Sequence, residues 1–196
     1  MEMTIDKIIG NKGGDFWKGL GQTDDRVYIK TPNARSILAR GIKHFVGEKA
    51  VWLEEYEKVA EWLEDNKGKG LLCAGSCGRG KTVITQKVLP LIFNICHRKI
   101  MNVITSTALN ERYDEFSKNK IISIDDVGIE SVANIYGEKR HFVQEIIDEA
   151  ERKQKLLVIS TNLNEKELIE KYDYRTVDRL RTLTSLVIFQ GESLRG

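Results

Sequence analysis

The chain has 196 residues, of which 41% are hydrophobic and 31% are charged, and its formal charge is +2 at pH 7. This profile fits one compact domain with a short extension, and the charge is too small to indicate nucleic-acid binding by itself. No segment approaches the roughly 20 apolar residues that cross a bilayer, and the N-terminus lacks a secretory signal, so we expect a cytoplasmic protein.

The cysteines and the short basic clusters give only weak indications of function. The three cysteines form no CxxC pair, which favours reduced thiols and argues against a thiolate metal site. Short basic clusters occur, but clusters of this size are more typical of solvated helix ends than of contacts with nucleic-acid phosphates. These clusters occupy residues 97–99, 139–140 and 152–155.

The first part of the chain is interpreted as a partly helical N-terminal extension of residues 1–49. Residues 1–30 are rich in glycine and polar residues and predict no defined element. Residues 33–46 follow a proline and predict a helix. We expect the remaining residues, 50–196, to form the core domain.

The core domain begins with a helix and continues as alternating strands and helices. Apolar residues at helical spacing predict an amphipathic helix over residues 52–63, and DNKGKG at residues 65–70 predicts a loop. Later helices are predicted over residues 138–154 and after Asn164, which can form a capping box with Glu167. The alternation is typical of a parallel sheet covered by helices on both faces. The predicted strands are residues 71–74, 101–105, 121–124, 156–160 and 186–189.

A glycine-rich loop follows the first predicted strand. Its sequence, GSCGRGKT, fits the Walker A pattern GxxxxGK[ST] and lies between a strand and a helix, as phosphate binding requires. Glycines let backbone N–H groups approach phosphate oxygens, and the helix N-terminus adds partial positive charge. We therefore predict that a nucleoside triphosphate is bound by Gly75, Ser76, Cys77, Gly78, Arg79, Gly80, Lys81, Thr82 and Val83.

Three side chains of this loop have individual roles. Lys81 is predicted to hold the β- and γ-phosphates, and the Thr82 hydroxyl is predicted to ligate Mg²⁺. Cys77 is either a neutral filler or a redox-sensitive thiolate near a helix N-terminus, and bound phosphate disfavours the second anion.

An acidic pair follows the third predicted strand, in IISIDDVG. This arrangement fits a Walker B element, in which Asp125 holds the Mg²⁺ shell and Asp126 orients and deprotonates the attacking water. Asp126 is one methylene shorter than glutamate, which shortens its reach to that water. The alternative for both residues is a solvated acidic turn.

Polar residues also follow the strand LLVIS, at the end that faces ligands in open α/β sheets. Asn162 is predicted to position water or contact the γ-phosphate. The alternative is a turn or cap residue, which is a common use of asparagine after a strand.

The segment YRTVDRLRT places Arg175 and Arg179 one helical turn apart on one face. Such an arginine can stabilise a transferring phosphoryl group from a neighbouring subunit. The alternative is a surface ion pair with Asp173 or Asp178, and the spacing alone favours neither.

Taken together, GSCGRGKT, IDDVG, STNLN and YRTVDRL resemble the AAA+ ATPases of the DnaC and IstB group, which are replicative helicase loaders and transposition helper ATPases. The resemblance spans about residues 50–196. It implies a P-loop α/β fold with a five-stranded parallel sheet of order 5-1-4-3-2 and no lid domain. It also implies that Asn162 is the sensor 1 residue, that Arg179 is the arginine finger with Arg175 as a neighbour, and that Arg195 in the ending GESLRG supplies a late positive charge.

The resemblance predicts an ATP-binding, ATP-hydrolysing replication accessory with Mg²⁺, acting as a helicase loader. Its catalytic residues would be Lys81, Asp125, Asp126, Asn162 and Arg179, with Thr82 and Asp125 at the metal. We expect a replicative helicase or a transposase as partner, single-stranded DNA, and a homo-oligomer that depends on nucleotide. The alternatives are a transposition helper, a nucleotide-binding module without turnover and, as a distant candidate, a small-molecule kinase.

Overall fold

A computed structural model describes residues 24–135 and 137–194 of the chain. Arg195 and the first 23 residues lie outside the described part, so the expectations for them stay predictions. Within the described residues, none of the helices has both the length and the apolar character needed to cross a bilayer.

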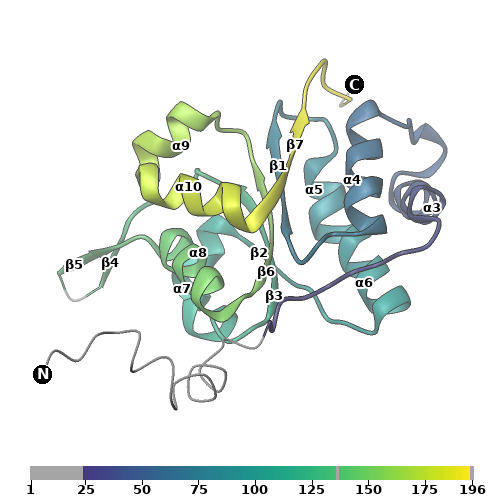
Figure 1. Cartoon of the computed structure of the whole chain (residues 1–196). Coiled ribbons are helices and arrows are strands. Elements are labelled where there is room, and N and C mark those ends of the chain that lie inside the picture. The colour runs from purple at the N-terminus through teal and green to yellow at the C-terminus, as the bar shows by residue number, and fades with distance from the viewer. Residues whose placement is uncertain (1–23, 136, 195–196) are drawn as a thin grey trace, which may run out of the picture.

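A five-stranded parallel sheet forms the centre of the molecule (Figure 1). Its spatial order is β2-β3-β6-β1-β7, which becomes 5-1-4-3-2 when the five strands are numbered along the chain and read from β7. The predicted fold class and sheet order are therefore confirmed. The strands are β1 (Gly70–Gly75), β2 (Asn102–Thr105), β3 (Ile121–Val127), β6 (Leu156–Thr161) and β7 (Thr184–Phe189).

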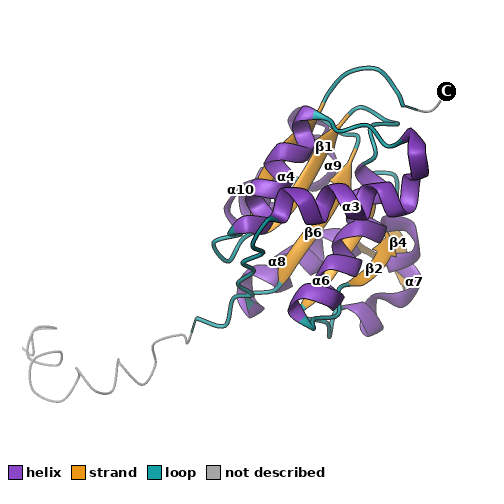
Figure 2. Ribbon diagram, turned by 90° about the vertical axis from the view of Figure 1, so that its right-hand side faces the viewer, coloured by secondary structure: helices purple, strands orange, loops and turns teal. Residues whose placement is uncertain are grey.

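Helices cover the sheet in two layers (Figures 1 and 2). One layer contains α3 (Ala34–Val46), α4 (Glu54–Glu64), α5 (Lys81–Val83) and α6 (Leu89–His97). The other contains α7 (Ser106–Phe116), α8 (Phe142–Lys153), α9 (Glu165–Tyr172) and α10 (Tyr174–Leu183). Because both sheet faces are covered, β1, β3 and β6 are almost continuously buried, and each of them carries a run of apolar residues.

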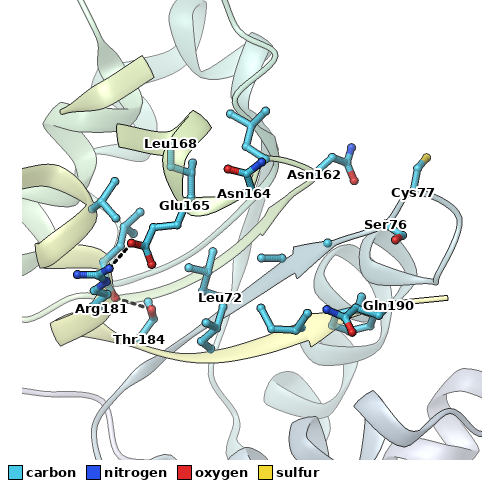
Figure 3. Close-up of a pocket in the computed structure, with 18 residues that line it drawn as sticks. Leu72, Ser76, Cys77, Asn162, Asn164, Glu165, Leu168, Arg181, Thr184 and Gln190 are labelled. Atoms are coloured by element: carbon cyan, nitrogen blue, oxygen red, sulfur yellow. Dashed lines mark hydrogen bonds and ion pairs between the residues drawn. The ribbon is translucent and has the colours of Figure 1, made fainter. Parts of the chain in front are cut away.

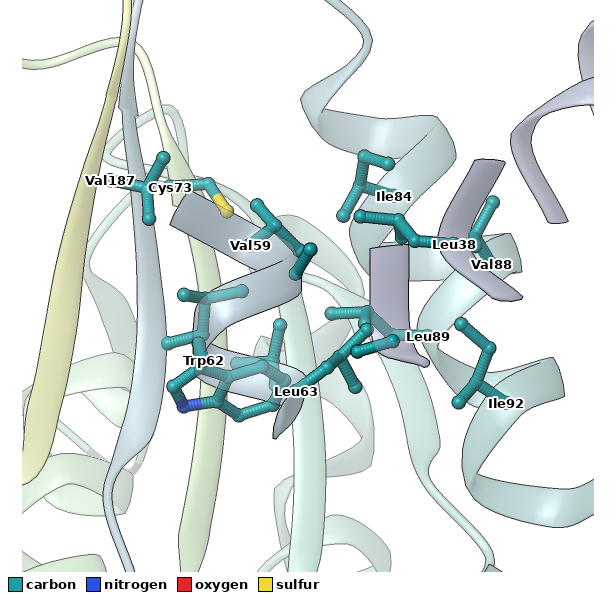
Figure 4. Close-up of a cluster of buried hydrophobic side chains, with 14 of the residues drawn as sticks. Leu38, Val59, Trp62, Leu63, Cys73, Ile84, Val88, Leu89, Ile92 and Val187 are labelled. Carbon is teal, nitrogen blue, oxygen red and sulfur yellow. The ribbon is translucent and has the colours of Figure 1, made fainter. Parts of the chain in front are cut away.

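Each helical layer packs on the sheet through its own apolar core. In the first core, shown in Figure 4, Leu38 of α3 and Leu63 of α4 are fully buried, and Cys73 of β1 lies across from them. The second core joins α7 to α10 with the opposite face of the sheet. Burying a Leu side chain of this kind contributes about 1.5–3 kcal/mol, so these contacts hold the strand ends in a fixed arrangement.

The described part of the N-terminal extension packs into the first core. Val27, Ile29, Leu38 and Ile42 are all buried there, and a short 3-10 turn, η2 (Gly47–Lys49), leads from α3 toward α4. The proposed domain boundary after residue 49 stays a prediction, but the extension and the core domain share an apolar core.

The helix after the glycine-rich loop is interrupted. Between α5 and α6 lies a π-helical segment, η3 (Ile84–Val88), and Pro90 occupies the first turn of α6. Because Val88 and Leu89 before it are also helical, Pro90 removes one N–H from a continuous helical ladder, which fits the altered hydrogen-bond pattern of this segment. Pi-helical turns are often found near functional sites, and this one directly follows the predicted phosphate loop.

The predicted helix at residues 138–154 is wrong at its start. Residues 138–140 form β5 (Glu138–Arg140), which pairs with β4 (Ala133–Ile135) in an antiparallel hairpin. Gly137 has φ of 87°, which suits a tight turn, and α8 begins only at Phe142. Glu138, Lys139 and Arg140 are good helix formers, so the sequence did not mark this boundary. By contrast, the predicted capping box of Asn164 and Glu167 is present at the start of α9.

Candidate functional site

The glycine-rich loop between β1 and α5 has the backbone shape of a phosphate cradle. Gly75, Gly78 and Gly80 have φ values of 125°, 78° and 87°, which side chains disfavour. At Gly75 an added Cβ would also meet the carbonyl group of Phe189 on β7. The three glycines are therefore needed for the turn itself and for the close approach of the neighbouring strand.

Lys81 is buried at the base of this loop. Its Nζ donates three hydrogen bonds of 2.7 Å, to the carbonyl oxygens of Gly75 and Ser76 and to Oδ1 of Asn162. Burial lowers the pKa of Lys81 from its usual value, while the nearby Asp126 and Asp125 carboxylates oppose that shift. The ammonium group is thus held inside the loop, at a position where phosphate oxygens would exchange with these acceptors.

Asp125 lies beneath the loop and is 3% exposed. Its Oδ1 accepts a hydrogen bond from the Ser160 hydroxyl and a longer one, 3.5 Å, from the Thr85 hydroxyl of η3. A buried carboxylate needs such donors because burial without partners is costly. Ser160 and Thr85 therefore both help to fix the direction of the Asp125 side chain through the same oxygen atom.

Asp126 points to the cavity through an unusual backbone conformation. Its φ is 53°, and the pairing of β3 with β6 shifts register between Ile124 and Val127. Such a bulge redirects a side chain at a strand end. The Asp126 N–H donates to the Ser160 hydroxyl (3.0 Å), and the Asp126 carbonyl accepts from the Ser106 hydroxyl (2.7 Å). The backbone of Asp126 is consequently held on both sides.

A cavity of about 460 Å³ lies over the loop. Its polar lining includes Lys81, Thr82, Asp126 and Asn162, which come from α5, β3 and the end of β6. Parallel strands present such groups together at their carboxyl ends. Its apolar wall is formed by residues of the N-terminal extension and the segment that follows it, namely Ile42, Val46, Ala50 and Val51.

The oxygen donors around this cavity fit Mg²⁺ in the company of phosphates. Among the described residues no cluster of three or more His, Cys, Asp or Glu side chains could hold a metal alone. Mg²⁺ in nucleotide sites instead uses one or two carboxylates together with substrate phosphates and water. The Thr82 hydroxyl and the Asp125 carboxylate are donors of that type.

Arg175 and Arg179, the two arginines of α10 named from the sequence, are absent from the lining of this cavity. Arg179 Nε donates to Glu151 Oε2 (2.6 Å), and Arg179 Nη1 pairs with Asp148, both of α8 in the same chain. Asp173 caps α10 by accepting the Thr176 N–H (2.7 Å). Arg179 is therefore engaged in an ion pair, but with different acids from the two proposed from sequence. Arg175, one turn away, is exposed.

The three cysteine thiols are free. Burial raises the pKa of the Cys73 thiol to about 12, which keeps it protonated. Cys77 is exposed on the loop, where it lines both the 460 Å³ cavity and a neighbouring one.

The neighbouring cavity is larger, about 700 Å³, and mostly apolar (Figure 3). It lies between the sheet and helices α9 and α10, with Leu72 and Leu168 among its walls and the Arg181–Glu165 ion pair at one side. It contains neither Lys81 nor the acidic pair. The smaller cavity is therefore the one that brings the Lys81 ammonium and the Asp126 carboxylate together.

Some contributors to the site were not predicted. Ser160 was recognised only as part of a polar strand end, yet it contacts both acids. Glu55 forms a buried ion pair with Arg79 of the loop. A sequence signal existed for Glu55, because it lies four residues before Val59 and so falls on the apolar stripe of α4. No sequence pattern indicated that residues of the N-terminal extension would line the cavity.

Comparisons with known proteins give structural matches only. No protein-family model matches the chain, and none of the curated proteins does. Among solved structures, the chain is similar to "Crystal Structure of the DnaI", with a TM-score of 0.50 and 18% identity over 82% of this chain and 87% of that one.

Two further matches have titles concerning replication. AMPPCP-bound DnaA from Aquifex aeolicus matches with a TM-score of 0.51 and 20% identity, over 73% of this chain and 49% of that one. A structure titled as a DNA replication initiation factor matches with a TM-score of 0.51 and 16% identity, over 72% and 48% of the two chains. At these identities the likeness concerns the fold, and on that level the expected resemblance is confirmed: the chain shares its α/β fold with these structures.

Proposed function

We propose that the 460 Å³ cavity binds ATP with Mg²⁺ and that the chain hydrolyses it. The observation that carries this proposal is the convergence of Lys81, Thr82, Asp126 and Asn162 on one cavity at the carboxyl ends of the strands. A chance glycine-rich turn has no reason to bring an ammonium, a hydroxyl and a carboxylate to one place. The proposal is supported by the AAA+ fold, in which this loop lies at the same end of the sheet.

In this proposal the loop and Lys81 bind the triphosphate. Backbone N–H groups from Gly75 to Thr82 surround the phosphates, and Lys81 exchanges its present acceptors for β- and γ-phosphate oxygens. Its link to Asn162 Oδ1 puts that side chain within reach of the terminal phosphate. The apolar wall with Ile42 and Val51 provides a surface for the nucleobase.

The acidic pair has two different tasks. Asp125, held by Ser160 and Thr85, and the Thr82 hydroxyl would hold Mg²⁺, which neutralises developing charge on the phosphates when bound. Asp126 accepts a proton from the attacking water, because its side chain lines the cavity and its backbone is fixed. Arg179 of a neighbouring copy completes the site after release from Asp148 and Glu151.

We further propose that this ATPase is a DNA replication accessory of the helicase-loader type. The support is the ordered set of motifs that resembles the DnaC and IstB group, together with the fold shared with structures titled as replication proteins. Its partners would be a replicative helicase and single-stranded DNA, in a homo-oligomer that forms with ATP.

ATP turnover with and without single-stranded DNA tests the enzymatic part. Asp126→Asn should keep ATP affinity and lose turnover by about 10²- to 10⁴-fold, the usual contribution of a general base. Lys81→Ala should lose affinity. Turnover by Asp126→Asn at the native rate would refute the role of Asp126. If the native protein binds ATP and does not hydrolyse it, the chain is a nucleotide-binding module and not an ATPase.

The replication role needs a partner test. The Asp126→Asn variant with ATP should retain the assembled state and capture a ring helicase from the native host. Capture of a transposase, or ATP-dependent filaments on duplex DNA, would instead identify a transposition helper.

A further inference from the structure

The chain turns back across the phosphate loop after β7. The Leu194 N–H donates to the Gly78 carbonyl oxygen (2.9 Å), and the Ser76 N–H donates to the Phe189 carbonyl oxygen (2.8 Å). In Figure 1 the yellow end of the chain bends from β7 back toward α4 and α5. Leu194 also lines the cavity that contains Lys81. We call residues 190–194 the C-terminal clasp.

Arg79 joins the C-terminal clasp to α4. Its Nε and Nη2 donate to Glu55 Oε1 at 2.9 and 2.7 Å, and its Nη1 donates to the Glu192 carbonyl at 3.3 Å. The Arg79 backbone carbonyl also accepts a hydrogen bond from the Tyr56 hydroxyl (3.2 Å). One residue of the phosphate loop is thus connected to the helix before β1 and to the segment after β7.

The side chain of Arg79 does not act on the cavity directly. Arg79 is absent from the cavity lining, and the Arg79 and Glu55 side chains are only 13% and 7% exposed. A buried arginine and carboxylate with two hydrogen bonds resist separation, because removing one partner leaves a charge without compensation. An added Cβ at Gly78 would meet the Ser193 side chain. The loop and the C-terminal clasp are therefore in direct contact at two points, Gly78 and Arg79.

We propose that the C-terminal clasp and Arg79 hold the phosphate loop in its phosphate-binding shape, and that Arg79 is a positioning residue for ATP. The inference rests on the proposed binding of ATP at this loop. Backbone N–H groups bind phosphate well only when they already converge, since ordering a loose loop costs affinity. Binding is reciprocal, so bound phosphate stabilises the C-terminal clasp in return.

Two substitutions at one position isolate the clasp hydrogen bond. Leu194→Pro removes the N–H that bonds to Gly78, whereas Leu194→Ala removes side-chain atoms and keeps that N–H. We expect Leu194→Pro to bind ATP about tenfold more weakly than Leu194→Ala, as loss of a fixing hydrogen bond predicts. Equal ATP affinities for the two variants would overturn the proposal for the clasp.

Arg79→Ala and Arg79→Lys test the link to α4. Both should raise the KM for ATP by about tenfold with kcat unchanged, because lysine keeps the charge but lacks the two-pronged contact with Glu55. Arg112→Ala is the matched control, since Arg112 forms an exposed ion pair with Glu115 on α7. Thermal unfolding shows which variants are folded. If folded Arg79→Lys has the native KM, Arg79 is not a positioning residue.

Hydrogen exchange separates positioning from a purely structural role. ATP should slow exchange of the Leu194 amide in the native protein and not in Lys81→Ala. Unchanged exchange with ATP bound would contradict the coupling. If the native protein binds no ATP, the proposed function fails; if it binds ATP through Lys81 while the Arg79 and Leu194 variants match their controls, only the present inference fails.

Discussion

The sequence points to two basic residues, Lys81 in the glycine-rich loop and Arg179 on α10. Their surroundings in the structure differ. Lys81 is buried among acceptors contributed by its own loop and by Asn162, the residue after β6. Arg179 bridges two half-exposed acids of α8. The first site is assembled within one chain, whereas the second faces the surface and has an intramolecular partner.

This difference shows which of the two sites a single chain can assemble without a neighbouring copy. At the loop, strand ends, glycines and a buried acid fix one another, so the groups need no outside partner to converge. At α10, the two acids that pair with Arg179 are about half exposed, and ion pairs open to water in this way contribute little to stability and exchange readily. A role for Arg179 in hydrolysis would therefore depend on assembly, while the role of Lys81 would not.

Among the variants that test this contrast, we expect the largest change in ATP turnover from a substitution at Arg179. In the proposed assembly, Arg179→Ala should lower turnover by about 10³-fold, the lower range for an arginine finger. Arg175→Ala, one helical turn away, is the matched comparison and should lower turnover less. Turnover measured across protein concentrations checks this. Native rates for Arg179→Ala at assembling concentrations would leave Arg179 as a local ion pair.

Ser160→Ala tests the site that is assembled within one chain. The variant removes the hydroxyl that contacts both Asp125 and the Asp126 backbone, so both acids lose their orientation. We expect turnover to fall roughly 10- to 100-fold at any protein concentration, the range for hydrogen bonds to charged groups. A loss seen only at low protein concentration would mean that Ser160 affects assembly instead.

Val51→Glu tests the apolar wall of the cavity. Val51 is 56% exposed, so the substitution should not disturb folding, yet it places a charge where the nucleobase is proposed to lie. ATP affinity should fall about tenfold while affinity for inorganic triphosphate stays the same, because only ATP carries a base to desolvate. Equal losses for both ligands would place the effect at the phosphates.

The smallest effect is expected at Arg181, on the same helix as Arg179. Its ion pair with Glu165 joins side chains that are 46% and 59% exposed. Arg181→Ala should change the free energy of unfolding by no more than about 1 kcal/mol, as for surface pairs in general. Denaturant unfolding measures this, and a larger change would show that exposed pairs on α10 contribute more than their exposure suggests.

The sequence predicted those features that depend on local patterns. The glycine-rich loop, the acidic strand and the capping box of Asn164 each follow from residues a few positions apart, and the sheet order followed from the family resemblance. The β4–β5 hairpin escaped prediction because Glu138, Lys139 and Arg140 are all good helix formers, so nothing in their local sequence separates them from α8.

Contacts between distant segments could not be predicted in the same way. The Arg79–Glu55 pair joins residues that are 24 positions apart, and the Lys81–Asn162 bond spans 81. The apolar wall from the extension depends on how α3 packs on α4, which no short pattern encodes. The charge and spacing of Arg179 also could not predict its ion pairs with Asp148 and Glu151 of α8.

A crystal structure with a non-hydrolysable ATP analogue and Mg²⁺ tests the central claim most directly. Binding in the 460 Å³ cavity should put the terminal phosphate within about 3 Å of Lys81 Nζ, a usual charge-assisted hydrogen-bond distance, with Asp126 facing it. An analogue bound instead in the 700 Å³ apolar cavity, or a terminal phosphate turned away from Lys81 and Asp126, would contradict the account.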